Sequence, residues 1–388
     1  APGGARFSVG RTDVRRSRYR EGVGVELDES QRAVLELPEG ASAVVIGAPG
    51  SGKTETLLAL AADRVHTRGY DAAELLVITG SRHSATELRD RLARELAVVT
   101  TGPLARTASS VAFELATAQA RAHDAAPPRL LSGADQDLMI RELLQGHLDD
   151  GRGPVWPEQL DAVVRRLPTF RVELRELLMR ATEFGVSPAE LRRLGQTTGR
   201  PAWVAAADFA VEYQTVLASA RGEMLDPAEL GAAAVHAIED GDLGERLSRV
   251  RLVLVDELQQ ATETTMRMLR ALAERGVTII GFGDPDTASN SFRGGEVDAV
   301  GGFGVRLGLP TAPRLVLSTV HRHGPSIRRV ISEITARIGA AGEGMQRAAE
   351  SAVADAVERP LLAIREASPA SHADAIARVL RERHLLDG

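Results

Sequence analysis

A glycine-rich loop that ends in lysine and threonine is the part of this sequence whose residue types most directly predict chemistry. The pattern G-x-x-x-x-G-K-T spans residues 47–54, after an apolar stretch at 43–46 that is typical of a buried strand and before apolar residues at helical spacing. A strand, such a loop and a helix in this order form a phosphate-binding loop, whose amides bind phosphate oxygens. The sequence therefore predicts a nucleoside triphosphate site, and a plain glycine-rich turn is the alternative.

The lysine of this loop has no counterpart elsewhere in the chain. Of the 47 lysine and arginine residues, Lys53 is the only lysine. A compact ammonium can reach between two phosphates where a planar guanidinium fits poorly, so lysine at this position supports a bridge between the β- and γ-phosphates. The hydroxyl of Thr54 is expected to ligate Mg²⁺.

Two carboxylates follow a second apolar stretch, at residues 252–255. Asp256 is the expected second Mg²⁺ contact, directly or through water, and Glu257 is expected to orient or deprotonate the water that attacks the γ-phosphate. Acidic residues are common at the ends of strands, so this pair alone is a modest signal. It indicates a nucleotide site because a phosphate-binding loop precedes it in the chain. Arg322 follows another apolar strand and offers a charge of the arginine-finger type, with a surface arginine as the alternative.

Composition and charge narrow the class of protein. The chain has 44% hydrophobic and 26% charged residues, as ordinary globular proteins do, and its net charge of −6 means that a nucleic-acid site would be a local arginine surface. The absence of cysteine excludes disulfides, thiolate metal sites and a cysteine nucleophile. No signal peptide and no apolar stretch of membrane-spanning length are present, so we expect a cytoplasmic protein without membrane contact.

Apolar strands that alternate with helices predict an α/β fold, a P-loop parallel sheet with helices on both faces. This domain is expected to be discontinuous, over residues 26–114 and 222–338, because residues 115–221 predict an all-helical accessory insertion. Residues 1–25 form a basic arm that contacts a partner or DNA, or is a solvated terminus. Residues 339–388 predict a linker and the start of a second domain, and a first residue other than methionine suggests a fragment.

Polar residues near other strands are candidates for recognising a base or a nucleic-acid backbone. Gln31 lies in a short predicted helix before the phosphate-binding loop, and a glutamine amide can satisfy the adjacent N6 and N7 atoms of adenine. Thr79 and Ser81 follow the apolar strand at 75–78, where hydroxyls suit phosphate-backbone contacts or, equally, the N-cap of the next helix. Open α/β sheets bind ligands at the carboxyl ends of their strands, where these residues gather.

In their order along the chain, these motifs resemble the N-terminal half of a superfamily 1 helicase of the UvrD/Rep/PcrA type. The motifs that carry the resemblance are L-x-x-x-Q ending at Gln31, the phosphate-binding loop, T-x-S at 79–81, L-D-P-A-E-L at 225–230, D-E-x-Q at 256–259, G-D-P-D at 283–286, F-R-G at 292–294 and H-R at 321–322. Within the family, the arginine- and alanine-rich chain most resembles a motor subunit of an actinobacterial AdnA/AdnB helicase–nuclease.

The resemblance implies a RecA-like motor that uses ATP and Mg²⁺ to translocate 3′→5′ on single-stranded DNA in repair or recombination, at the nucleoid. The implied catalytic residues are Lys53, Glu257, Gln259 as a γ-phosphate relay, and Arg322 as the finger. Implied nucleotide contacts are Gln31, Gly47, Ala48, Pro49, Gly50, Ser51, Gly52, Lys53, Thr54, Glu55, Asp256 and His321, of which Thr54 and Asp256 hold the metal. Implied DNA contacts are Thr79, Ser81, Ser109, Phe292 and Arg293.

Several positions depart from the family pattern. The departures are Glu55 for arginine, Gly80 for an aromatic residue, Gln260 for aspartate, Thr287 for glutamine, Asn290 for tyrosine and His321 for the adenine-stacking tyrosine. They keep the hydrolysis residues but reduce base stacking, which contributes about 1–3 kcal/mol per base.

These departures leave two interpretations of the chain open. One is an active helicase motor. The other is a degenerate, catalytically weak subunit that serves as a structural or DNA-binding part of a helicase–nuclease complex, beside a second motor or nuclease subunit. A P-loop kinase has no support beyond the loop. Because the motifs of a second motor domain do not follow, the chain alone is expected to be weak or inactive.

Overall fold

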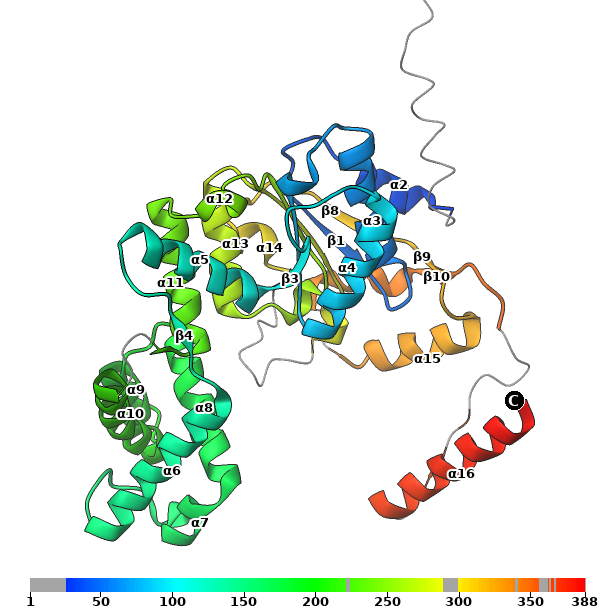
Figure 1. Ribbon diagram of the computed structural model, residues 1–388. Coiled ribbons are helices and arrows are strands. Elements are labelled where there is room, and N and C mark those ends of the chain that lie inside the picture. Colours follow the sequence, from blue (N-terminus) through cyan, green and yellow to red (C-terminus); the bar gives the residue numbers. More distant parts are fainter. Residues whose placement is uncertain are drawn as a thin grey trace, which may run out of the picture.

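A parallel six-stranded sheet forms the centre of the molecule, in the order β3-β2-β6-β7-β1-β8 (Figure 1). The computed structural model describes residues 26–220, 224–288, 299–338, 341–355, 362, 364–365 and 368–387. The strands of this sheet are β1 (Ala43–Gly47), β2 (Leu75–Thr79), β3 (Ala105–Thr107), β6 (Leu252–Val255), β7 (Thr278–Gly283) and β8 (Arg314–Leu317). Each neighbouring pair is parallel.

Helices cover both faces of this sheet, which explains why its inner strands are apolar along their whole length. Every residue of β1, β2, β6 and β7 is buried. One face packs against α2 (Glu29–Leu35), α3 (Lys53–His66) and α4 (Arg82–Leu96). The other face packs against α5 (Ala108–Ala122), α11 (Pro227–Asp240), α12 (Gly244–Leu247), α13 (Glu263–Glu274) and α14 (Phe303–Arg306). The predicted α/β class with a parallel sheet covered on both faces is confirmed.

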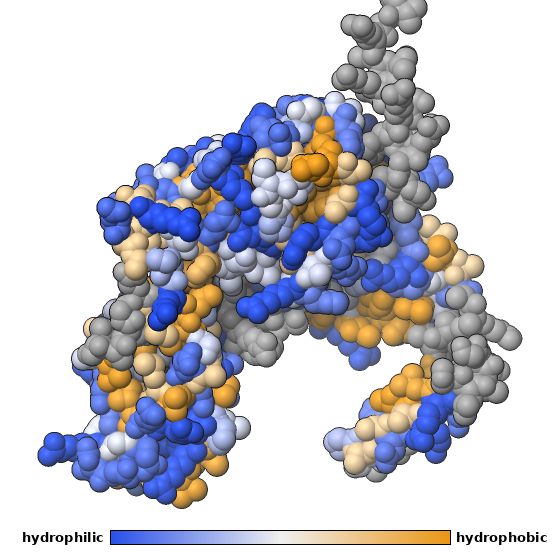
Figure 2. Space-filling view, viewed as in Figure 1, coloured by the Kyte–Doolittle hydropathy of each residue, from blue (hydrophilic) through white to orange (hydrophobic). Residues whose placement is uncertain are grey.

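A second group of helices projects away from the sheet (Figure 1). Its members are α6 (Gly133–Asp150), α7 (Ala162–Arg166), α8 (Pro168–Glu183), α9 (Pro188–Thr197) and α10 (Pro201–Ala220). The group has its own hydrophobic core around Phe170, Phe209 and Ile140, and Figure 2 shows further apolar residues on its surface. Two short strands, β4 (Arg129–Leu130) and β5 (Met224–Leu225), pair where the chain enters and leaves this helical group.

Helix α5 crosses the position at which the sequence places the start of the insertion. Its residues Leu115 and Ala116 lie in the same hydrophobic core as strands β1 and β2, and α5 packs along α11. The chain therefore leaves the sheet domain after α5, because the apolar face of that helix is already buried against the sheet.

The chain after β8 forms a smaller unit beside the phosphate-binding loop. Strands β9 (Thr319–Val320) and β10 (Glu350–Ser351) pair in parallel, although the sequence places β10 in a linker. Buried Arg328 of α15 (Pro325–Thr335) donates to the carbonyls of residues 346, 347 and 349. These hydrogen bonds hold the segment before β10 against α15. Helix α16 (Pro369–Asp387) follows.

Short 3₁₀ helices complete the secondary structure of the described residues. They are η2 (Ala72–Glu74), η3 (Glu158–Leu160), η4 (Leu258–Gln260), η5 (Pro285–Thr287) and η7 (Ala341–Ala348). Among the helices of these residues, none combines the length and the apolar character needed to cross a bilayer. The predicted basic arm at 1–25 and half of the predicted strand at 361–364 lie outside the described residues.

Candidate active site

The phosphate-binding loop connects β1 to α3 at the carboxyl edge of the sheet. Its Gly50 and Gly52 both have φ of +81°, a left-handed conformation that favours glycine. A Cβ on Gly52 would lie 2.4 Å from Nε2 of Gln31, and one on Gly50 would lie 2.8 Å from Cβ of Arg322. The loop is therefore packed between two residues that the sequence predicts to act on the nucleotide, one before it and one far downstream.

Lys53, the first residue of α3, is folded onto the loop that precedes it. Its ammonium donates to the carbonyls of Gly47 at 2.8 Å and Ala48 at 3.1 Å. Burial lowers the pKa of Lys53, while the nearby carboxylates of Asp284 and Asp256 oppose that shift. A desolvated ammonium that has only neutral carbonyl acceptors gains more from anionic phosphate oxygens than an exposed one does.

Thr54 and Asp256 place two oxygens side by side. The Thr54 hydroxyl donates to Oδ2 of Asp256 at 3.1 Å, and the amide of Glu257 donates to Oδ1 at 3.0 Å. Asp256 is buried, and this burial raises its pKa, while the hydrogen bond from Thr54 opposes the shift. A hydroxyl and a carboxylate are the oxygen ligands that Mg²⁺ prefers, so this pair fits the predicted metal contact.

Glu257 has a strained backbone beside this pair. Its φ and ψ are 52° and 44°, in the left-handed region that a non-glycine residue rarely adopts. Burial, and then the charge of Asp256, raise the pKa of its carboxyl group. Strained backbone conformations concentrate at functional sites, where the surrounding structure fixes them. The side chain lines the same cavity as Lys53 and Thr54.

Gln259 and Asp284 close the inner end of the site. The amide of Asp284, just after β7, donates to Oε1 of Gln259 at 3.1 Å, and both side chains are buried. Oδ2 of Asp284 has no hydrogen-bond partner among the described residues. Burial raises the pKa of Asp284, and Lys53 opposes that shift. Asp284 therefore faces the lysine as a third carboxylate, a role that the sequence analysis does not assign to it.

Gln31 and His321 lie on the outer side of the loop. Gln31 and Asp28 cap the start of α2 reciprocally, and Nε2 of His321 lies 2.8 Å from Oδ2 of Asp28. The amide of His321 donates to the carbonyl of Gly50 at 2.9 Å. These contacts bring the two predicted adenine-side residues to the loop from positions 290 residues apart. Their side chains do not line the central cavity.

A cavity of about 360 Å³ lies in front of the loop. Its lining includes Lys53, Thr54, Glu55, Asp256, Glu257, Gln259 and Arg322 from the predicted set, and Ser84, Glu87, Leu88, Arg91, Asp284 and Thr287 besides. Arg91 of α4 donates to both carboxylate oxygens of Glu55 at 2.6 Å. The carboxylate that replaces the family's arginine is thus paired with an arginine from the neighbouring helix, which the sequence analysis did not single out.

The predicted DNA contacts lie on the neighbouring strand ends, in different environments. Thr79 ends β2 with its side chain buried, and Ser81 caps α4 by accepting from the amide of Ser84 at 3.0 Å. Ser109 is exposed in the first turn of α5. Phe292 and Arg293, like the departure at Asn290, lie outside the described residues.

Three of the departures from the family pattern lie together beside the carboxylate of Glu257. A Cβ on Gly80 would lie 3.2 Å from Cβ of Gln260 and 3.7 Å from Oε2 of Glu257. Nε2 of the Gln260 side chain in turn donates to the carbonyl of Thr287 at 3.4 Å. The changes at Gly80, Gln260 and Thr287 are therefore neighbours in space rather than scattered substitutions.

The fold and the cavity define a P-loop nucleotide-binding domain, with the residues predicted to contact phosphate, metal and the attacking water on one edge of a parallel sheet. The family model described as the UvrD/REP helicase N-terminal domain matches residues 27–304, which is well over half of the chain. The chain belongs to this family of DNA helicases, so the predicted superfamily 1 resemblance is confirmed at that level. A search of curated proteins gives no match.

Family membership places the chain among ATP-dependent DNA helicases in general. Such helicases use ATP with a divalent metal, and they bind DNA.

Proposed function

We propose that this chain is an ATP-hydrolysing motor that moves along single-stranded DNA, with Lys53, Glu257, Gln259 and Arg322 as its catalytic residues. The observation that carries the proposal is the convergence of these four side chains, from three separate segments, on one cavity of about 360 Å³. The segments come after β1, β6 and β8 of the sheet, the last by way of β9, at the strand ends where α/β folds bind their ligands.

Each residue has a distinct part in this proposal. Lys53 exchanges the carbonyls of the loop for β- and γ-phosphate oxygens when ATP binds. Thr54 and Asp256 hold Mg²⁺, which supplies positive charge to the phosphates when it is bound. Glu257 accepts the proton of the attacking water, and its raised pKa makes it a stronger base than an exposed glutamate. Arg322 lies at the mouth of the loop, beside Gly50.

Gln259 has the position expected of a relay. Its side chain lines the cavity and also accepts a hydrogen bond from the backbone amide of Asp284, just after β7. A movement of Gln259 with the γ-phosphate would therefore shift the segment that follows β7. Gln31 and His321 are proposed to contact the adenine side of the nucleotide. Glu55 stays in the proposed nucleotide set, with its charge balanced by Arg91.

The finer assignments rest on family resemblance and are part of the proposal. They are 3′→5′ movement in DNA repair or recombination, a motor domain interrupted by an accessory domain, a second motor domain that completes the ATP site, and a partner subunit of the AdnA/AdnB kind. The proposed DNA contacts are Thr79, Ser81, Ser109, Phe292 and Arg293.

A degenerate, weakly active subunit is the second candidate, and a specific observation favours it. The departures at Gly80, Gln260 and Thr287 adjoin one another between Glu257 and the strand ends proposed to contact DNA. A cluster of changes at this place weakens the physical link through which DNA binding could promote hydrolysis. The hydrolysis residues Lys53, Glu257, Gln259 and Arg322 themselves do not favour this candidate.

The experiment is a steady-state ATP hydrolysis assay with Mg²⁺ and single-stranded DNA, comparing wild type with Lys53→Ala, Lys53→Arg and Arg94→Ala. We expect both Lys53 variants to lose activity by about 10²–10³-fold, as when one transition-state charge donor is removed. Arg94, which is exposed on α4, is the control and should have no effect. Activity that persists in Lys53→Ala at the wild-type rate would reject the assignment.

A further inference from the structure

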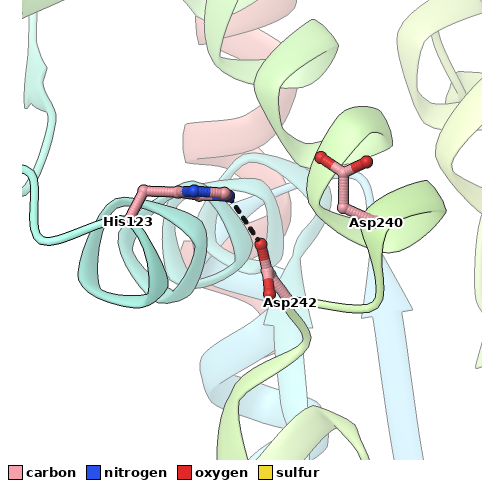
Figure 3. Close-up of side chains that lie close together, drawn as sticks. All are labelled: His123, Asp240 and Asp242. Carbon is pink, nitrogen blue, oxygen red and sulfur yellow. Dashed lines mark hydrogen bonds and ion pairs between the residues drawn. The ribbon is translucent and has the colours of Figure 1, made fainter.

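An imidazole and two carboxylates lie close together where helices α5 and α11 end (Figure 3). His123 follows the last residue of α5, Asp240 is the last residue of α11, and Asp242 comes two residues later. One potential ligand atom from each side chain lies within 4.8 Å of the other two. Among the described residues, this is the only group of three or more such side chains at that spacing.

Two of the three side chains, His123 and Asp242, already have the spacing of metal ligands. Nε2 of His123 lies 3.1 Å from Oδ2 of Asp242, and Figure 3 shows the ring directed at that carboxylate. Zn–N and Zn–O bonds of about 2.0–2.1 Å put tetrahedral ligand atoms about 3.3 Å apart, so these two atoms are at ligand spacing. The Asp240 carboxylate is exposed, and the side-chain amide of Gln119 donates to its Oδ2 at 3.0 Å, while one of its oxygens already lies within 4.8 Å of the ligand atoms of His123 and Asp242.

The backbone adds to the attraction for a cation at this point. Helix α5 has 15 residues and α11 has 14, and both end here, so the partial negative charges of two helix C-termini coincide with two formal carboxylate charges. Arg275 approaches from α13, but its guanidinium donates to the carbonyl of Ile238 at 3.0 Å, a different acceptor.

We propose that His123, Asp240 and Asp242 bind a transition-metal ion of the Zn²⁺ type, with water in the fourth position. One imidazole nitrogen and two carboxylate oxygens suit Zn²⁺, whereas Mg²⁺ binds oxygen ligands and requires near-ideal octahedral geometry. The ligand set is separate from the Thr54–Asp256 pair at the P-loop, because it lies at the far ends of α5 and α11.

The ion would join the two helices on which the helical group is mounted. Helices α5 and α11 pack together through Leu115, Ala234 and their neighbours, and the chain between the two metal-binding ends contains all of α6–α10. An ion that binds the folded chain alone stabilises it by mass action, so the site acts as a removable clamp between the C-terminal ends of α5 and α11.

The test is calorimetric titration of ZnCl₂ into chelator-treated protein without nucleotide or Mg²⁺. We expect one Zn²⁺ bound per chain, and each of His123→Ala and Asp242→Asn should weaken that binding at least about tenfold. His236→Ala is the matched control, because His236 is also an exposed histidine beside a carboxylate, with Glu239 at 3.4 Å. This control should leave the affinity within about twofold, below the loss expected from removing a true ligand.

Thermal unfolding provides a second readout that separates binding from folding. Zn²⁺ should raise the Tm of wild type and of His236→Ala but not that of His123→Ala, and the metal-free proteins should unfold at similar temperatures. The proposal is overturned if Zn²⁺ does not bind, or if His123→Ala and Asp242→Asn bind it as wild type does. It is equally overturned if Asp256→Asn removes the binding, because the ion would then occupy the nucleotide site.

Discussion

The Thr54 hydroxyl donates to Oδ2 of Asp256 at 3.1 Å, across 202 positions of sequence and across the intervening strand β7. This hydrogen bond joins the first turn of α3 to the end of β6 and fixes the spacing of the two oxygens proposed to hold Mg²⁺. The site is therefore arranged by the order of strands in the sheet rather than by proximity along the chain.

Removal of the Thr54 hydroxyl tests this relationship. Thr54→Val keeps the shape of the side chain and should weaken Mg²⁺-dependent ATP binding about 10- to 100-fold, equivalent to about 1.5–3 kcal/mol for a hydrogen bond to a charged group. Thr54→Ser restores the hydroxyl and should bind nearly as wild type does. Titration with a fluorescent ATP analogue, with and without Mg²⁺, measures both. Equal binding by the valine and serine variants would remove Thr54 from the metal site.

Glu257→Gln tests the proposed base. The substitution should lower kcat for ATP by about 10²–10⁴-fold while ATP binding is retained, because the amide cannot accept the proton of water. Glu274, which is exposed on α13, provides the control Glu274→Gln. A Glu257→Gln enzyme that turns over ATP at the wild-type rate would show that another group is the base.

The pH dependence of the same reaction follows from burial. The pKa of Glu257 is raised, and the active form of a base is the carboxylate, so activity should fall on the acid side at a pH above the ordinary glutamate value of 4.5. A profile of kcat/KM against pH measures the position of this acid limb. An acid limb at or below 4.5 would contradict the assigned environment.

Alanine substitutions at two glycines separate the effect of a strained backbone from the effect of a steric contact with Gln31. Gly52 and Gly69 have φ of +81° and +78°, but a Cβ on Gly52 would lie 2.4 Å from Gln31, while nothing lies within 4 Å of one on Gly69. Both alanine variants should lose about 1 kcal/mol or more of stability through the left-handed backbone. Only Gly52→Ala should also weaken ATP binding, because its Cβ displaces the side-chain amide of Gln31. Thermal unfolding and ATP titration distinguish the two effects.

A buried carboxyl at the base of the helical group predicts a pH-dependent stability. Oε2 of Glu183 has no hydrogen-bond partner among the described residues, and burial, with a contribution from Asp226, raises its pKa to about 7 against the attraction of Arg180. The folded chain therefore binds a proton that the unfolded chain releases near 4.5. The free energy of unfolding should fall as pH rises from about 4.5 to about 7.

Glu183→Gln should remove that dependence. At pH 8 the variant should have a Tm higher than wild type by a few degrees, since 1 kcal/mol corresponds to about 2–4 °C in domains of 150–250 residues. At pH 4 the two proteins should differ little, because Glu183 is protonated in both the folded and unfolded chain. Glu173→Gln, at an exposed position on the same helix, is the control. A wild-type-like Tm at pH 8 would show that Glu183 is solvated.

Much of the sheet can be predicted from the sequence, because buried parallel strands are continuous apolar runs. The stretches at 43–46, 75–78 and 252–255 correspond to β1, β2 and β6. Strand β3 was not predicted, since it has three residues at the edge of the sheet and only Ala105 is buried. The order of the strands has no local signal in the sequence, because it depends on long-range pairing.

The same distinction, between local sequence patterns and long-range packing, applies to the candidate site. Lys53, Thr54 and Asp256 belong to motifs whose spacing is local, so their chemistry could be assigned before their positions were known. Arg91 reaches the cavity from the middle of α4, and it does so because α4 packs beside α3; no spacing rule indicates this. Asp284 was visible as part of a motif, but its approach to Lys53 depends on β7 lying next to β1.

The central claim is that ATP hydrolysis at Lys53 and Glu257 is coupled to DNA, and a titration of ATP hydrolysis with single-stranded DNA tests it most directly. The account predicts that turnover by wild type rises severalfold and saturates with DNA, while Glu257→Gln stays inactive at every DNA concentration. No turnover at saturating DNA, in protein that binds ATP, would contradict the active motor and favour the degenerate subunit. Turnover that does not change with DNA would contradict both.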